Sequence, residues 1–286
     1  MAGRDGEVTR VLKRVSQVLD RGRFDEALRD LLHLSEKYPD AGEIRPQIAE
    51  VYIRRGESRV RKGRTREAQA DFERSLSWSR KPAALVALAR ARLDAGELDR
   101  ADELLNAALE IDDRHGPTHE AMGQVFLAWN EHKEAARAFE QSLGLGHATP
   151  GLYLDVWTAY LRLERFDRAH ELILEGADRF PDNDTLQAAV GDSWIYTKGD
   201  SGEARPYWEN AVRLNPRNFG ALFSLAADAA AREERATALE RLKACAELDL
   251  ERARRMWKDD LGSPFRKFGA FARDAEFRAA LGWMND

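Results

Sequence analysis

The stretch DEALRDLLHL at residues 25–34 decides the fold class of this chain. Its apolar residues Ala27, Leu31 and Leu34 recur at i, i+4 and i+7, so they would form one stripe along an α-helix. The glycine turn just before it and the two carboxylates at its start suit the beginning of a helix. A helix cannot bury such a stripe by itself, so the stretch predicts a helix that packs against similar neighbours.

The same pattern recurs along the chain at a nearly constant interval. An alanine opens each copy, the successive spacings are 41, 33, 34, 34, 35 and 34 residues, and a large apolar residue follows each alanine four positions later. The alanines are Ala27, Ala68, Ala101, Ala135, Ala169, Ala204 and Ala238, and the large residues are Leu31, Phe72, Leu105, Phe139, Ile173, Trp208 and Leu242. A period in the range of roughly 20 to 50 residues indicates a repeat architecture in which each unit stacks on the next.

These residues resemble the tetratricopeptide repeat over roughly residues 8–251. The resemblance implies two antiparallel helices per repeat, stacked into a right-handed superhelix whose first helices line a concave groove. We therefore expect an all-α solenoid of about seven repeats at residues 1–251. Repeat two has seven extra residues (41 against 34) before its alanine, and apolar residues keep helical spacing across them, so its first helix should be elongated, near residues 44–62.

The period is lost at residues 252–286, which we expect to form C-terminal capping helices. A terminal repeat leaves an apolar face open, and solenoids need a cap for that face. A docking surface for a partner is the alternative role of this segment. Its large apolar residues are Trp257, Phe265, Phe268, Phe271, Phe277, Leu281 and Trp283.

Composition favours a cytoplasmic protein with protein partners. No apolar stretch reaches the roughly 18 to 20 residues of a membrane span, the N-terminus lacks a signal-peptide profile, and the single cysteine, Cys245, fits a reducing compartment. Arginine far outnumbers lysine, which is typical of high-GC bacterial genomes. The net charge of −5, with an acidic middle and mildly basic ends, argues against nucleic acid as a partner. We expect no membrane insertion.

The sequence offers no set of residues for catalysis, a metal or a cofactor. His115 and His119 are four residues apart, but Gly116 and Pro117 between them place His115 in a loop. No CxxC or comparable zinc-binding spacing is present. Cys245 occupies a small-residue core position without a basic neighbour in sequence, so a buried, inert thiol is expected. We expect a protein that is not an enzyme.

The resemblance places one face of each first helix in the concave groove. That face changes from charged residues in the early repeats to small and apolar residues in the late repeats, where an apolar anchor of a partner could bind. Leu154, Ala189 and Phe223 fall at the same position of three successive repeats and should form one strip. The predicted partner-binding residues are Arg90, Gln124, Leu154, Thr158, Arg162, Ala189, Ser193, Phe223 and Ala227.

A basic run, Arg54, Arg55, Arg59, Arg61 and Lys62, lies in the elongated helix of repeat two. We expect a solvated helix face of exposed charges. A patch for an acidic partner segment is the first alternative. Nucleic acid or an anionic membrane is a weaker one, because no aromatic residues for base stacking are interleaved with the charges.

Together these features favour a non-catalytic scaffold or adaptor that binds an extended or helical segment of a partner protein in its groove. The alternative is a regulatory or sensor module whose groove takes a short peptide or another small ligand. An enzyme, or a dedicated subunit of one, is the least favoured reading.

Overall fold

The structure is a computed structural model that describes residues 2–199, 201–262 and 267–282. Within these ranges the chain forms sixteen α-helices and one short 3₁₀ helix, and it contains no β-strand. The predicted all-α fold class is confirmed. None of the helices in these ranges combines the length and the apolar character that a membrane-spanning helix requires.

The chain forms two compact units, Met1–Ala148 and Thr149–Asp286. The helices of the first unit are α1 (Ala2–Asp20), α2 (Phe24–Lys37), α3 (Ile44–Arg61), α4 (Thr65–Trp78), α5 (Pro82–Asp94), α6 (Leu98–Leu109), α7 (Gly116–Ala128) and α8 (His132–Gly144). In the region where the sequence predicts an elongated helix, α3 has 18 residues, against 13 for both α5 and α7.

The second unit continues the same alternation of helices. Its elements are α9 (Pro150–Arg162), α10 (Phe166–Arg179), α11 (Asp184–Lys198), α12 (Ser201–Leu214), α13 (Phe219–Ala231), α14 (Arg235–Leu248), α15 (Leu250–Gly262), the 3₁₀ helix η1 (Gly269–Phe271) and α16 (Ala275–Ala280).

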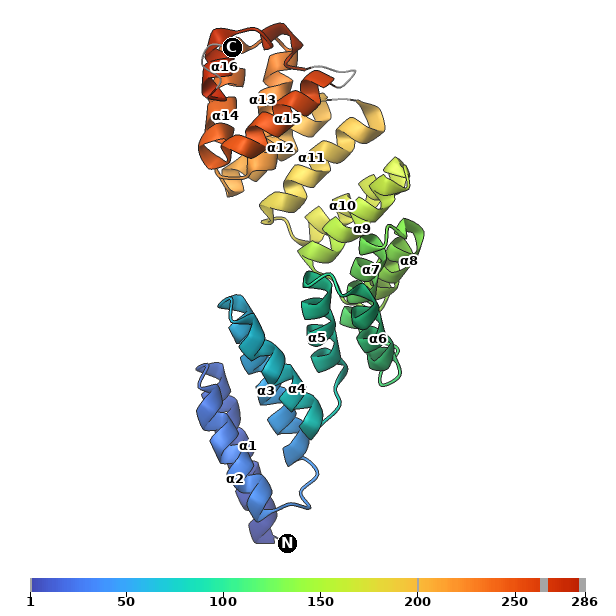
Figure 1. The fold of residues 1–286 in the computed structure, drawn as a ribbon, viewed down its shortest axis with the longest axis vertical. Coiled ribbons are helices and arrows are strands. Elements are labelled where there is room, and N and C mark those ends of the chain that lie inside the picture. The colour runs from blue at the N-terminus through green and yellow to red at the C-terminus, as the bar shows by residue number, and fades with distance from the viewer. Residues whose placement is uncertain (1, 200, 263–266, 283–286) are drawn as a thin grey trace. The chain divides into compact units, whose positions relative to one another are not determined.

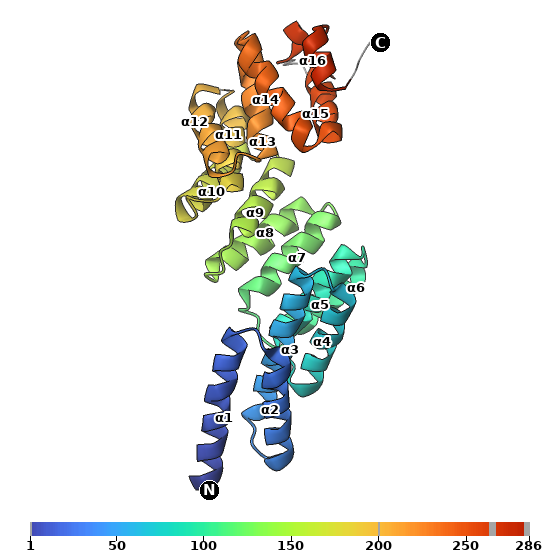
Figure 2. The same ribbon diagram turned by 90° about the vertical axis from the view of Figure 1, so that its left-hand side faces the viewer.

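Helices pack as consecutive pairs, and the pairs stack within each unit (Figure 1). In the first unit α3 packs on α4, α5 on α6 and α7 on α8, while the first helices also contact one another from α3 to α5 and from α5 to α7. In the second unit α9, α11 and α13 form the corresponding row, each packed on the helix that follows it (Figure 2). This row of first helices is the arrangement that the repeat predicts.

The repeating residues form the core between the paired helices. All seven repeat alanines have 0% of their surface exposed, and the seven large apolar residues four positions later are exposed by at most 2%. The helices approach closely where a glycine faces a large aromatic ring. A Cβ atom built on Gly123 of α7 would lie 2.4 Å from Cε1 of Phe139 on α8. The ring therefore occupies the space that a side chain at residue 123 would need.

The C-terminal segment packs on the last helix pair. Trp257 of α15, Phe268, Phe271 and Phe277 are buried in one apolar cluster with Phe223 of α13. Both α15 and α16 contact α14. The predicted tail residues Phe265 and Trp283 lie outside the described residues. This packing supports the assignment of residues 252–286 to a cap, which stays a prediction.

Gly123→Ala should lower the free energy of unfolding by about 1–3 kcal/mol, because the added methyl group overpacks the contact with Phe139. The matched control is Gly144→Ala at the end of α8, where an added Cβ meets no atom within 4 Å. There the higher helix propensity of alanine should stabilise the chain by up to about 1 kcal/mol. Urea unfolding followed by circular dichroism measures both changes, and equal effects of the two substitutions would contradict this account of the close approach.

Candidate functional site

The candidate site is a pocket in the second unit, at the row of first helices. The pocket has a volume of about 600 Å³, which lies within the usual range of roughly 300 to 1,000 Å³ for ligand pockets. Its apolar walls are formed by Ile195 and Tyr196 of α11, Trp208 of α12, Phe223, Ala227 and Ala231 of α13, and Met256 of α15. Its polar lining includes Asp192, Ser224, Asp228, Asp260 and Lys267.

Asp192 of α11 is the carboxylate that most sets the chemistry of this pocket. Its Oδ1 accepts hydrogen bonds from Nε1 of Trp208 at 2.9 Å and from Oγ of Ser224 at 3.0 Å. Burial raises the pKa of Asp192 to about 6, although the bonds from Ser224 and Trp208 and the charge of Lys267 act in the opposite direction. The pocket therefore holds a carboxylate whose charged form is poorly compensated by its surroundings.

The two other carboxylates of the pocket are already engaged. Asp228 accepts a hydrogen bond from Nε of Arg205 at 2.9 Å and also pairs with Arg232. Burial alone would raise the pKa of Asp228, but the bonds from Ser201 and Arg205 outweigh burial, and the net pKa is lowered. Asp260 accepts the backbone N–H groups of Lys267 and Phe268, at 3.2 and 2.9 Å. Asp192 differs from Asp228 in forming no ion pair with any described residue, and from Asp260 in taking its two hydrogen bonds from side chains.

Two predicted partner-binding residues, Phe223 and Ala227, line the pocket. The two predicted for α11 do not, because Ala189 and Ser193 are buried among the helices. Oγ of Ser193 donates to the carbonyl oxygen of Val190 at 2.7 Å and lies 2.7 Å from Nδ1 of His170. In this repeat the face that was predicted to line the groove is buried between helices. Asp192, one residue before Ser193, faces the pocket instead.

One extra residue in repeat six explains this difference. Gly56 and Gly123 face aromatic rings 16 residues later, at Phe72 and Phe139, whereas Gly191 faces Trp208, 17 residues later. Alignment on the repeat alanine therefore assigns the groove face of α11 one residue too late. The interval between the glycine and the aromatic residue was the sequence signal that could have identified Asp192.

The other predicted groove residues lie away from this pocket. On α9, Leu154 and Thr158 are half-buried and Arg162 is exposed, and Oγ1 of Thr158 donates to the carbonyl oxygen of Leu154 at 2.8 Å. In the first unit, Arg90 pairs with the buried Glu120 at 2.5 Å, and Gln124 is half-buried on α7. The structure thus brings Phe223 and Ala227 together in one pocket. The other five residues, on α5, α7 and α9, do not line that pocket.

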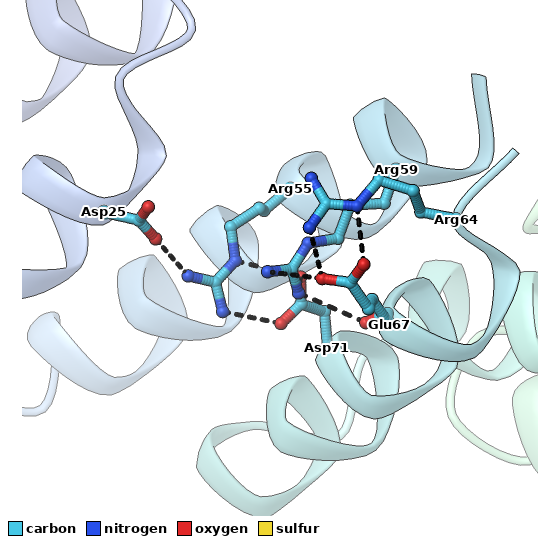
Figure 3. Close-up of polar contacts among 6 residues, drawn as sticks. All are labelled: Asp25, Arg55, Arg59, Arg64, Glu67 and Asp71. Atoms are coloured by element: carbon cyan, nitrogen blue, oxygen red, sulfur yellow. Dashed lines mark hydrogen bonds and ion pairs between the residues drawn. The ribbon is translucent and has the colours of Figure 1, made fainter. Parts of the chain in front are cut away.

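The predicted basic patch is divided between structural and exposed residues. Figure 3 shows Arg55 and Arg59 of α3 pointing toward Asp71 of α4, with Asp25 of α2 on the far side of Arg55. Arg55 binds both oxygens of Asp71, at 2.6 and 2.9 Å, and Arg59 binds Oδ2 at 2.5 Å. Glu67 binds both Arg59 and Arg64.

The expectation of exposed charges is therefore wrong for Arg55 and Arg59, whose side chains are 12% and 21% exposed. Asp71 has 0% of its surface exposed, so a buried carboxylate requires these two cations. Arg54, Arg61 and Lys62 are exposed as expected. An acidic residue directly before the core residue Phe72 was the available sequence signal for this pairing.

Stacked helix pairs with small and large residues alternating in the core define a helical-repeat protein of the solenoid class. Residues 60–124 match the family model described as tetratricopeptide repeat. The resemblance that the sequence pattern predicts is therefore confirmed over these residues. Among curated proteins, no sequence matches the chain.

Solved tetratricopeptide-repeat structures share the fold. PilF of Pseudomonas aeruginosa has a TM-score of 0.63 at 18% identity, covering 79% of this chain and 97% of PilF. YrrB, described as a TPR protein with an unusual peptide-binding site, has a TM-score of 0.51 at 20% identity, covering 65% of this chain and 97% of YrrB. A chain of the APC/C hetero-tetramer Cut9–Hcn1 has a TM-score of 0.58 at 16% identity; the match covers 74% of this chain but only 40% of that longer one. At these identities the likeness concerns the fold alone.

Asp71→Asn should lower the free energy of unfolding by about 3–5 kcal/mol, because it leaves Arg55 and Arg59 facing a buried neutral group. The control is Asp25→Asn, since Asp25 also bonds to Arg55 but its side chain is 82% exposed. Exposed ion pairs contribute at most about 1 kcal/mol, so the control should have a small effect. Urea unfolding measures both variants, and a loss no larger for Asp71→Asn than for Asp25→Asn would refute the structural role of this cluster.

Asp192→Asn should stabilise the fold at neutral pH. A carboxyl group whose pKa is raised from 3.8 to about 6 favours folding below its unfolded pKa and loses that contribution as pH rises through 6. Asparagine keeps an acceptor for Trp208 and Ser224 but does not ionise. The unfolding free energy of the variant relative to wild type should therefore increase by about 2 kcal/mol as pH rises from 4 to 7.5. Thermal unfolding over this pH range tests the sign, and a difference that does not change with pH would contradict it.

Proposed function

We propose that this chain is a non-catalytic scaffold or adaptor that binds a segment of a partner protein. The pocket at α11, α13 and α15 is the observation that carries the proposal. Helices α11 and α13 are neighbours in the row of first helices, and the pocket beside them has Phe223, Ile195 and Met256 of α15 in its walls. A large side chain of a partner, buried in such a pocket, would supply much of the binding energy, as anchor residues at interfaces usually do.

The shared fold supports the same class of function. Tetratricopeptide repeats generally form a non-catalytic interaction fold. Among proteins with this fold, YrrB is described as having a peptide-binding site, and Cut9–Hcn1 is described as a hetero-tetramer. Both descriptions concern those proteins. For this chain they support a partner protein as the occupant of the groove.

The state of the single cysteine supports a role without catalysis. Cys245 is buried, and burial raises the pKa of its thiol to about 12, against a small opposing effect of the Arg252 charge. The thiolate is the nucleophilic form of cysteine, so this thiol is a poor nucleophile near neutral pH. Its Sγ instead lies 4.0 Å from the carbonyl oxygen of Phe219 in the core.

A regulatory or sensor module is the second candidate, and the size of the pocket favours it. A volume of about 600 Å³ can hold a small ligand or a short peptide as well as one anchor of a larger partner. The two candidates differ in the molecule that depends on the pocket, so the same variant tests both.

Ala231→Trp should abolish partner capture by filling the mouth of the pocket, since Ala231 is exposed at the end of α13. Ala236→Trp, at an exposed position of α14 outside the pocket, is the matched control. Affinity purification from extract of the native host, with mass spectrometry, should recover a partner with wild type and Ala236→Trp and at least tenfold less with Ala231→Trp. Melting temperatures confirm that all three proteins fold.

Equal recovery of every bound protein by the three forms would overturn the assignment of partner binding to this pocket. Loss of a bound small molecule without loss of any protein would favour the sensor module instead. Mass spectrometry of the native eluate detects both outcomes.

A further inference from the structure

We propose that the pocket at α11, α13 and α15 selects a lysine side chain of the partner segment, with the lysine ammonium group paired to Asp192. This inference rests on the proposed function, because it names the chemistry of the anchor that the groove would take. It is carried by the geometry of Asp192, by the charges around it and by the apolar walls beside it.

The first support is the way in which Asp192 is held. Within the described residues, its two hydrogen bonds, from Trp208 and Ser224, both end on Oδ1, and neither uses Oδ2. These two donors fix the carboxylate in the pocket wall and leave its second oxygen for another partner. A lysine ammonium group is a compact point charge that needs one acceptor, whereas an arginine fork is suited to two parallel acceptors. The arrangement therefore favours lysine over arginine.

The second support is the balance of charge around Asp192. Asp228 of α13 is neutralised by Arg205 and Arg232, and Asp260 of α15 accepts two backbone N–H groups. Tyr196 of α11 also lines the pocket as a neutral phenol. Lys267 is the facing cation, but it forms no ion pair with Asp192 in the described part of the chain, and its charge is the smallest of the influences on the Asp192 pKa.

The desolvated carboxylate would gain from an added cation. Burial disfavours the charged form of Asp192, as its raised pKa indicates. A buried charge is best compensated by an opposite charge with good geometry, and none of the described residues forms an ion pair with Asp192. Asp71 and Asp228 are each paired with arginines of this chain. Asp192 forms no such pair with a described residue.

The third support is the apolar surface beside the carboxylate. Ile195, Phe223 and Met256 share the pocket with Asp192. Lysine can bury its aliphatic stem along such walls while its charged end reaches a carboxylate. A purely apolar anchor would leave Asp192 uncompensated, and an acidic anchor would be repelled by it.

The test uses the methyl group of Met256 as a reporter inside the pocket. The full chain has 4 methionines, so labelling with [methyl-¹³C]methionine gives a simple spectrum, and Met256→Leu assigns the pocket signal. The probe is N-acetyl-lysine-N-methylamide, titrated at pH 7.5. Its matched controls are the norleucine and arginine counterparts and the glutamate counterpart. Met122 of the first unit serves as the internal reference.

The lysine probe should shift the Met256 signal in a saturable way and bind at least fivefold more tightly than the norleucine and arginine probes. Asp192→Asn should remove this preference, whereas Asp259→Asn, at an exposed position of α15 outside the pocket, should keep it. Affinity for lysine should fall about tenfold from pH 7.5 to pH 5, because a carboxyl group with a pKa near 6 is then mostly protonated.

Several results would overturn the inference. Equal binding of the lysine and norleucine probes would show a pocket that selects only apolar groups. Preferential binding of the glutamate probe would show that Lys267 sets the selectivity. No movement of the Met256 signal with any probe, or unchanged lysine binding in Asp192→Asn, would also refute it.

These results separate the inference from the proposed function. If Ala231→Trp loses its partner while the lysine preference is absent, the pocket binds partners through another kind of side chain. If the lysine preference is present while Ala231→Trp keeps every partner, the pocket binds lysine but does not anchor the scaffold's partner.

Discussion

The close approach of paired helices through small residues is the constraint on which this structure depends. Where Gly123 faces Phe139, the aromatic ring lies against the backbone of the partner helix, and Ala135 of the same helix as Phe139 is fully buried. This contact fixes how each pair is assembled. Because each pair still leaves an apolar face uncovered, stacking on the next pair follows, and stacking produces the row of first helices in each unit.

Buried charge is handled in two different ways along this framework. Asp71 is paired with Arg55 and Arg59, and Asp228 is paired with Arg205, so both carboxylates are compensated within the chain. Such pairs add little net stability, but breaking one is costly, so they restrict how the helices can pair. Asp192 has hydrogen-bond donors but no ion pair with any residue that the structure describes. A partly buried carboxylate of this kind in a pocket is typical of a binding site rather than of a structural pair.

The C-terminal segment contributes to both packing and the pocket. Phe268 and Phe277 pack with Trp257 and, through Phe268, with Phe223 of α13, which covers apolar surface of the last pair. The same segment provides Met256 and the Asp260 side chain to the pocket. A capping role and a role in partner binding are therefore compatible, because one face of α15 can cover the core while its edge lines the pocket.

The sequence by itself determined the helical class, the period and the core, because these depend on residues such as Ala204 and Trp208 that recur at fixed intervals and meet the same neighbours in every repeat. It also predicted Phe223 and Ala227 as groove residues, and both line the pocket. Only the tertiary structure decided that Asp192 faces the pocket, since one extra residue before Trp208 rotates the helix face by about 100°. It likewise decided the pairing of Arg55 with Asp71: an ion pair joins two particular side chains on different helices, and no periodic pattern encodes such a pair.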